Sequence, residues 1–140
     1  MRGPTDRFFA VIAAALLVAG GVIHLRLYFD GYRDVPNANL GRSFLLNAAA
    51  SFGVAALVVV WRSWLAPLAG LLVVNGTLIG FALSRTDRGI LDFTEAGFNP
   101  RPEAALSLVV EIGAAIVLLA LLVRRAEASN ETAPRRAQST

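Results

Sequence analysis

Four long apolar segments dominate this chain and restrict it to very few folds. They occupy residues 8–29, 44–61, 64–83 and 104–123. A helix needs about 20 residues, with about 17 to 25 observed, to cross a hydrocarbon core roughly 30 Å thick. The segments are apolar on all sides and do not alternate with a period of two, which argues against β-strands. Only helices satisfy their own backbone hydrogen bonds over such lengths in lipid without closing a barrel. We therefore expect an all-α fold, a four-helix transmembrane bundle of up-down-up-down topology.

The composition agrees with a membrane protein and excludes several kinds of chemistry. The chain is 56% hydrophobic and only 16% charged, whereas soluble domains are about a quarter charged. It contains no cysteine and one histidine, which excludes disulfides, thiolate metal sites and a bis-histidine haem within one protomer. All thirteen basic residues are arginine, so there is no Schiff-base or phosphate-loop lysine. We expect no cofactor and no metal site.

The first apolar segment has an alternative interpretation as a secretory signal, because Arg2 and Arg7 precede it. Its uninterrupted apolar run over residues 8–23 is long for a signal core, and no clear Ala-x-Ala cleavage site follows. We interpret it as an uncleaved span. The predicted organisation is a four-span membrane domain over residues 1–125 and a polar, disordered tail over 126–140.

The connections between the segments differ in length. Arg62 and Ser63 alone join the second and third segments, which predicts a tight antiparallel hairpin with Trp61 and Trp64 at headgroup level. The connections over residues 30–43 and 84–103 are longer. The second of these contains apolar residues between prolines and glycines, so it could lie along the membrane surface.

The distribution of arginines gives only a weak preference for one orientation. With four spans, the side that holds both termini carries seven arginines and the other side six, and the positive-inside rule counts basic residues. The acids are more unequal, so the net charges are +4 and zero. We predict a bacterial inner-membrane protein with both termini in the cytoplasm. The arginines flank the spans as membrane anchors, so no nucleic-acid partner is expected; the bilayer itself is a partner.

The polar residues within the spans all lie in one half of the predicted bundle or near its midplane. On this topology that is the extracytoplasmic half, and the stretches 8–19, 54–60, 65–74 and 112–123 contain no such group. On the second segment Ser43, Asn47 and Ser51 recur every four residues and so share one helix face. The candidate ligand or proton-site residues are His24, Glu111, Asn47, Asn75, Thr77 and Arg26.

Glu111 is the most informative of these residues, because a charged side chain in hydrocarbon costs about 2.5 to 3.5 kcal/mol and should face the bundle interior. By the rise of about 1.5 Å per residue, His24 and Glu111 lie about 7 Å and 10 Å from the same ends of their spans. If the first and fourth spans adjoin, the two side chains should lie within about 8 Å of one another, with Asn47, Asn75 or Thr77 beside them. The competing interpretation is an interhelical hydrogen-bond cluster that fixes the register of the bundle.

Three glycines are candidates for close helix packing. Gly20 lies one turn before His24 and would let another helix approach, and Gly76 with Gly80 forms a G-x-x-x-G pair. Such pairs are the usual close-contact device of membrane helices. We expect the pair to contact another helix of the bundle or a second copy.

Two stretches resemble a known group of proteins. The first is His24-Leu25-Arg26-Leu27-Tyr28, which continues through Gly31-Tyr32-Arg33 and Pro36 to Phe44-Leu45-Leu46-Asn47; the second is Phe81-Ala82-Leu83-Ser84 followed by Ser107-Leu108-Val109-Val110-Glu111. Together they resemble small, uncharacterised four-helix bacterial integral membrane proteins, a likeness that implies the fold and no activity. Membrane disulfide-forming enzymes and vitamin K epoxide reductases need cysteine pairs, and small multidrug transporters carry their glutamate in the first helix, so these classes fit poorly. The likeness to DoxX-type proteins is architectural only.

The leading functional interpretation is a small, non-enzymatic multi-pass membrane protein with a polar pocket in the extracytoplasmic half of the bundle. It would act as a subunit or accessory, either as a homo-oligomer or in a larger membrane complex. One alternative is a proton-coupled carrier or small-molecule binder that uses Glu111 and His24, although no inverted repeat is visible. Another is an oxidoreductase subunit that holds a quinone, or a haem on the single histidine.

Overall fold

The computed structural model describes residues 4–137, with side chains at all positions except 38 and 131–137. It consists of four long α-helices, α1 (Pro4–Phe29), α2 (Ala38–Val60), α3 (Leu65–Ser84) and α4 (Glu103–Ala137), and a short 3-10 helix, η1 (Tyr32–Asp34). Within residues 4–137 there is no β-strand, only an isolated antiparallel bridge between Ile90 and Phe93. The predicted all-α class is confirmed.

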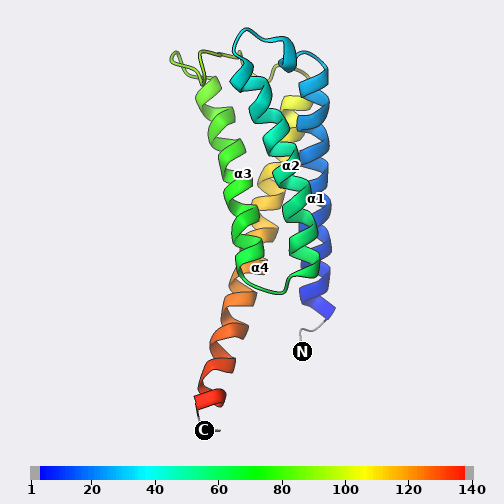
Figure 1. Ribbon diagram of the computed structural model, residues 1–140, viewed down its shortest axis with the longest axis vertical. Coiled ribbons are helices and arrows are strands. Elements are labelled where there is room, and N and C mark those ends of the chain that lie inside the picture. The colour runs from blue at the N-terminus through cyan, green and yellow to red at the C-terminus, as the bar shows by residue number, and fades with distance from the viewer. Residues whose placement is uncertain (1–3, 138–140) are drawn as a thin grey trace.

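The helices form an up-and-down bundle in which each helix packs against its neighbours in the chain and α4 closes the ring against α1 (Figure 1). The two ends of the bundle differ. The loop end carries the connections 30–37 and 85–102, and the terminal end carries Pro4, the turn 61–64 and the extension of α4. The predicted hairpin between the second and third segments is the turn at the terminal end.

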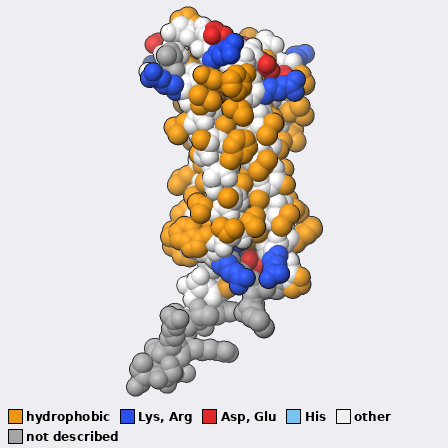
Figure 2. All heavy atoms as spheres, turned by 45° about the vertical axis from the view of Figure 1, so that its right-hand side comes forward, with side chains coloured by type: hydrophobic (Ala, Val, Ile, Leu, Met, Phe, Trp, Pro, Cys, Tyr) orange, Lys and Arg blue, Asp and Glu red, His pale blue; other side chains and the backbone are white. Residues whose placement is uncertain are grey.

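All four helices are long and apolar enough to cross a membrane, over Pro4–Phe29, Asn39–Val60, Leu65–Ser84 and Glu103–Asn130. These spans match the predicted segments to within a few residues at most of their ends. Figure 2 shows the corresponding surface, a broad apolar middle with arginines and acids gathered at the two ends of the bundle. Large apolar side chains are openly exposed along this middle, among them Leu46, Leu72 and Val109 at 71%, 69% and 70%. Such a surface suits lipid better than water.

The structure differs from the sequence analysis at the tail. Residues 126–137 continue α4 beyond the bundle (Figure 1), where a disordered segment was expected over residues 126–140; residues 138–140 lie outside the described residues. The stretch is rich in Ala, Arg and Glu, which are good helix formers. Extending an existing helix also avoids the cost of nucleation.

The apolar core lies in the terminal half of the bundle. Ala13, Val58, Val74 and Leu118 come from four different helices and are all 0% exposed. Gly70 lets α4 approach α3 closely, because a β-carbon at this position would lie 2.9 Å from both methyl groups of Leu118. Side chains from all four helices therefore meet in one buried core in this half, as in a protein interior.

A buried arginine joins the helices at the terminal end. Arg125 on α4 is 2% exposed and donates hydrogen bonds to the main-chain carbonyls of Val58 (2.9 Å), Trp61 (3.2 Å) and Ser63 (3.3 Å). The carbonyls at a helix C-terminus have no partner within the helix, so Arg125 caps α2. Its Nε also lies 3.8 Å from a carboxylate oxygen of Asp6 on α1. One side chain thus connects α1, the α2–α3 turn and α4.

Candidate functional site

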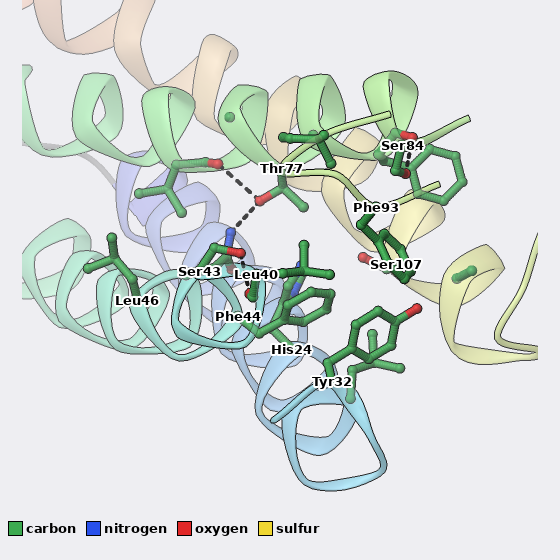
Figure 3. A pocket seen from close by; sticks show the side chains of 18 of the residues that line it. His24, Tyr32, Leu40, Ser43, Phe44, Leu46, Thr77, Ser84, Phe93 and Ser107 are labelled. Atoms are coloured by element: carbon green, nitrogen blue, oxygen red, sulfur yellow. Dashed lines mark hydrogen bonds between the residues drawn. The ribbon is translucent and has the colours of Figure 1, made fainter. Parts of the chain in front are cut away.

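A cavity of about 410 Å³ lies in the loop half of the bundle, mainly between α2 and α3 (Figure 3). Its volume falls within the roughly 300–1,000 Å³ of sites for small molecules. Apolar side chains make up most of the wall, and α1 and α4 contribute His24, Leu27, Ala104 and Ser107. The connection 85–102 closes the loop end of the cavity with Ile90, Phe93, Asn99 and Pro100.

Two of the three residues of the polar stripe predicted on the second segment, Ser43 and Asn47, line this cavity. Asn47 on α2 donates a hydrogen bond to the hydroxyl of Thr77 on α3, and Thr77 donates in turn to the carbonyl of Val73 (3.1 Å). Ser51 donates to the side-chain oxygen of Asn47 (3.3 Å), and Ser43 lines the cavity one turn nearer the loop end. Asn47 and Thr77 therefore join two helices at the wall of a largely apolar space.

His24 lies at one end of a row of aromatic rings in the same wall. Its Nδ1 is 2.9 Å from the carbonyl oxygen of Gly20. A carbonyl only accepts, so this nitrogen carries the proton and Nε2 of the neutral ring is an acceptor. The ring centroid of His24 lies 5.5 Å from Phe44, which stacks on Tyr32 at 4.4 Å, and Tyr32 meets Phe93 at 5.6 Å. The row runs from the histidine to the loop end.

Glu111 on α4 is 3% exposed and packs against the same turn of α1. A β-carbon on Gly20 would lie 2.8 Å from Glu111 Oε1, so a larger residue at this position would require the carboxyl to move. The first and fourth spans do adjoin, and Gly20 contacts both candidate residues, one through its carbonyl and the other through its bare Cα. Among the described residues no hydrogen bond or ion pair joins the imidazole to the carboxyl. The cavity wall includes His24 but not Glu111.

The remaining candidates divide between the cavity and the outer surface. Arg26 is exposed and forms a 3.4 Å ion pair with Asp30, away from Glu111 and the cavity. Asn75 is also exposed, and its amide donates to the carbonyl of Leu71 (2.7 Å) on its own helix. The structure therefore brings His24, Asn47 and Thr77 to one cavity and leaves Arg26 and Asn75 outside it.

The G-x-x-x-G pair of α3 also borders the cavity. No atom lies within 4 Å of a β-carbon built on Gly76, and the nearest to one on Gly80 is Ile90 Cδ1, at 3.8 Å. Within this chain the two glycines thus provide empty space rather than close contact between helices. A contact with a second copy stays a prediction.

Sequence reasoning missed the residues that hold the loops over the cavity. Tyr32 donates a 2.7 Å hydrogen bond to Glu95. Burial, with the hydrogen bond and the charge of Glu95, raises the pKa of Tyr32, which keeps the hydroxyl a donor at neutral pH. Arg85 lies over the ring of Phe81 at 3.7 Å and donates to the carbonyls of Gly97 (3.0 Å) and Asn99 (2.8 Å). Tyr32 lay within the resembling stretch, but nothing in the sequence linked it to position 95.

The cavity reaches the outer surface of the bundle between α2 and α3. Leu46 and Leu72 both line it, yet they are 71% and 69% exposed. Because these helices are candidate membrane spans, that opening would face the acyl chains of lipid. No group of three metal-ligating side chains occurs anywhere in the part of the chain that the structure describes.

Comparison with protein-family models, with curated proteins and with solved structures finds no match to this chain. The functional interpretation therefore rests on the residues and their geometry.

Proposed function

We propose that this chain is a small, non-enzymatic integral membrane protein that binds one lipophilic molecule with a polar end in the cavity between α2 and α3. The observation that carries the proposal is the cavity itself: about 410 Å³, mostly apolar walls and a few convergent polar groups. Binding sites for small molecules have this character. We place the protein in a bacterial inner membrane with both termini in the cytoplasm.

The opening between Leu46 and Leu72 supports a ligand that partitions into lipid. An acyl or isoprenoid chain in the bilayer would reach the cavity sideways without crossing water. Its polar end would meet the free acceptor Nε2 of His24 and the hydroxyl of Ser107. A head group that both donates and accepts hydrogen bonds, such as a hydroxyl or a reduced quinone, suits these partners.

A second candidate function is a proton-coupled carrier, favoured by Glu111. Its carboxyl is buried in a span, next to a turn that also positions His24. Proton flux into proteoliposomes that disappears in Glu111→Gln would support the carrier. Binding without any flux would support the simple binder. In either case the protein acts as an accessory or subunit of a larger membrane system, which co-purification of a stable partner would support.

The binding proposal is tested by filling the cavity. Gly76→Phe adds a ring at a position that lines the cavity and has open space around it. Gly53→Phe is the matched control, because Gly53 on α2 is also exposed with open space but does not line the cavity. Both changes replace a helical glycine and should raise helix propensity similarly.

The probe is a fatty alcohol that carries a photoactivatable diazirine, added to the protein in lipid nanodiscs. After irradiation, the modified peptides are mapped by mass spectrometry. We expect labelling of cavity peptides from α2 and α3 in the wild type and in Gly53→Phe, and at least a tenfold loss in Gly76→Phe, since the ring occupies the binding space. Equal labelling in the two variants would refute the proposal.

A further inference from the structure

Asn75 is a polar side chain that faces outward at the middle of α3. It is nine residues from Ser84 and ten from Leu65, the two ends of the helix. At a rise of about 1.5 Å per residue it lies about 14 Å from either end, near the centre of the hydrocarbon. Its amide makes a single described hydrogen bond, as donor to the carbonyl of Leu71. A carboxamide has a second N–H and an accepting oxygen, which lipid cannot satisfy.

The cavity is not the partner of Asn75. Successive residues of a helix are about 100° apart, so Thr77, two positions on, lies on nearly the opposite side. Thr77 lines the cavity and bonds Asn47, whereas Asn75 does not line it. The polar groups of α3 are therefore split, with one serving the cavity and the other directed away from this bundle.

The neighbours of Asn75 on this side of the helix are apolar. We call this surface the Asn75 face, and it consists of Leu68, Leu72, Asn75, Ile79 and Ala82. Leu72 and Ile79 are 69% and 58% exposed, and Ala82 is also exposed. Leu68, Asn75 and Ala82 are spaced by seven residues, the repeat of two helices that pack along a common seam. A single asparagine in such a seam fixes the register of the pair.

We propose that the Asn75 face binds the Asn75 face of a second copy of this chain. Two copies inserted in one membrane have the same orientation, so their α3 helices run parallel. A twofold axis along the membrane normal then brings residue 75 beside residue 75 at the same depth. A carboxamide both donates and accepts, so two identical amides satisfy one another. Interhelical hydrogen bonds of this kind hold membrane helices together.

Self-pairing is preferred over a different partner because the face is complementary to itself. The face carries no charged residue, so a partner needs no opposite charge. Its one polar group, the amide of Asn75, needs a hydrogen-bond donor and an acceptor at the same depth in the membrane. A second copy supplies both without further assumption. The dimer would leave the polar wall of the cavity unchanged, because Thr77 and Asn47 lie on the other side of α3. Leu72 belongs both to this face and to the opening of the cavity, so the dimer would lie beside the route from lipid. The inference itself rests on Asn75 and not on the proposed binding function.

The absence of cysteine from the chain permits a direct test by disulfide cross-linking. Ala82→Cys places a thiol on the Asn75 face two residues before the end of α3. Leu106→Cys is the matched control, three residues into α4 and 51% exposed, but on another face of the bundle. In oxidised membranes we expect a covalent dimer from Ala82→Cys and little from Leu106→Cys. Equal cross-linking at both positions would indicate random collision and would overturn the proposal.

The role of the amide is tested in the Ala82→Cys background over a dilution series in lipid. Asn75→Leu keeps the size of the side chain but removes its amide. It should weaken the dimer about 5- to 30-fold, as loss of polar contacts between membrane helices does. Asn75→Gln retains a carboxamide and should keep most of the cross-linking. Unchanged dimerisation in Asn75→Leu overturns the proposal, and so does a stable complex in which a different protein covers α3. Native mass spectrometry of the cysteine-free protein, which should show two chains, checks the stoichiometry independently.

Discussion

Replacing Arg125 by methionine should destabilise the bundle strongly. The guanidinium donates three hydrogen bonds to main-chain carbonyls, at 2.9, 3.2 and 3.3 Å, and is 2% exposed. Hydrogen bonds to a charged group contribute about 1.5–3 kcal/mol each. Two of these are long, which places each of them at the low end of that range. The expected loss is therefore about 4.5–6 kcal/mol, slightly above the roughly 3–5 kcal/mol for breaking other buried ion pairs.

The neighbouring arginine provides the control for this prediction. Arg124→Met removes the same charge, but Arg124 is exposed and lies 5.8 Å from the ring of Phe9, so its loss should cost less than about 1 kcal/mol. Equilibrium unfolding in mixed micelles can be followed by the fluorescence of the two tryptophans, which both flank the turn that Arg125 holds. Arg125→Met combined with Asp6→Asn should recover part of the loss, because the carboxylate that faces residue 125 is then neutral as well. Equal unfolding of Arg125→Met and Arg124→Met would refute the reasoning.

Two further predictions concern orientation and the loop end. A cysteine in place of Ala96, in the loop 85–102, should react with a membrane-impermeant thiol reagent in intact cells. A cysteine in place of Ser139, which lies outside the described residues, should be shielded from the reagent. The reverse labelling pattern would overturn the predicted orientation. Tyr32→Phe removes the 2.7 Å hydrogen bond to Glu95 and should destabilise the loop by about 1 kcal/mol, seen as faster amide hydrogen exchange over residues 85–102. Tyr28→Phe is its control, and equal exchange in the two variants would contradict the role of Tyr32.

The fold was predictable because hydrophobicity along the chain encodes it directly. Each apolar segment has the length of a span, and Arg62 with Ser63 leaves only a tight turn between two of them. The end of α4 was not predictable in the same way, because the polar residues after Arg125 suit either a helix or a disordered tail. Arg125 itself was interpreted as a membrane anchor like its neighbour. Only the packing of α4 against the α2–α3 turn distinguishes a buried arginine from an exposed one.

The candidate site was predictable in depth but not in direction. Counting residues from the span ends placed every intramembrane polar group in the loop half or near the midplane, and the cavity is in the loop half. Helical spacing also grouped Ser43, Asn47 and Ser51. It could not decide whether Asn75 or Thr77 faces inward, because that depends on how α3 is rotated against α2. The loop contacts of Tyr32 and Arg85 could not be predicted from the sequence, because they join residues that are far apart in it.

The contrast between the two halves of the bundle bears on the choice between a binder and a carrier. The terminal half is closed by core residues from all four helices and by Arg125, and the cavity extends only about as deep as Ala50 and Leu72. A carrier would have to open this half in each cycle and would break the bonds of Arg125 in doing so. A binder needs only the opening toward lipid. Loss of the Arg125 hydrogen bonds should therefore raise flux through a carrier, whereas probe labelling of a binder should not increase. Arg125→Met, measured in both assays on the protein that remains folded, thus separates the two functions.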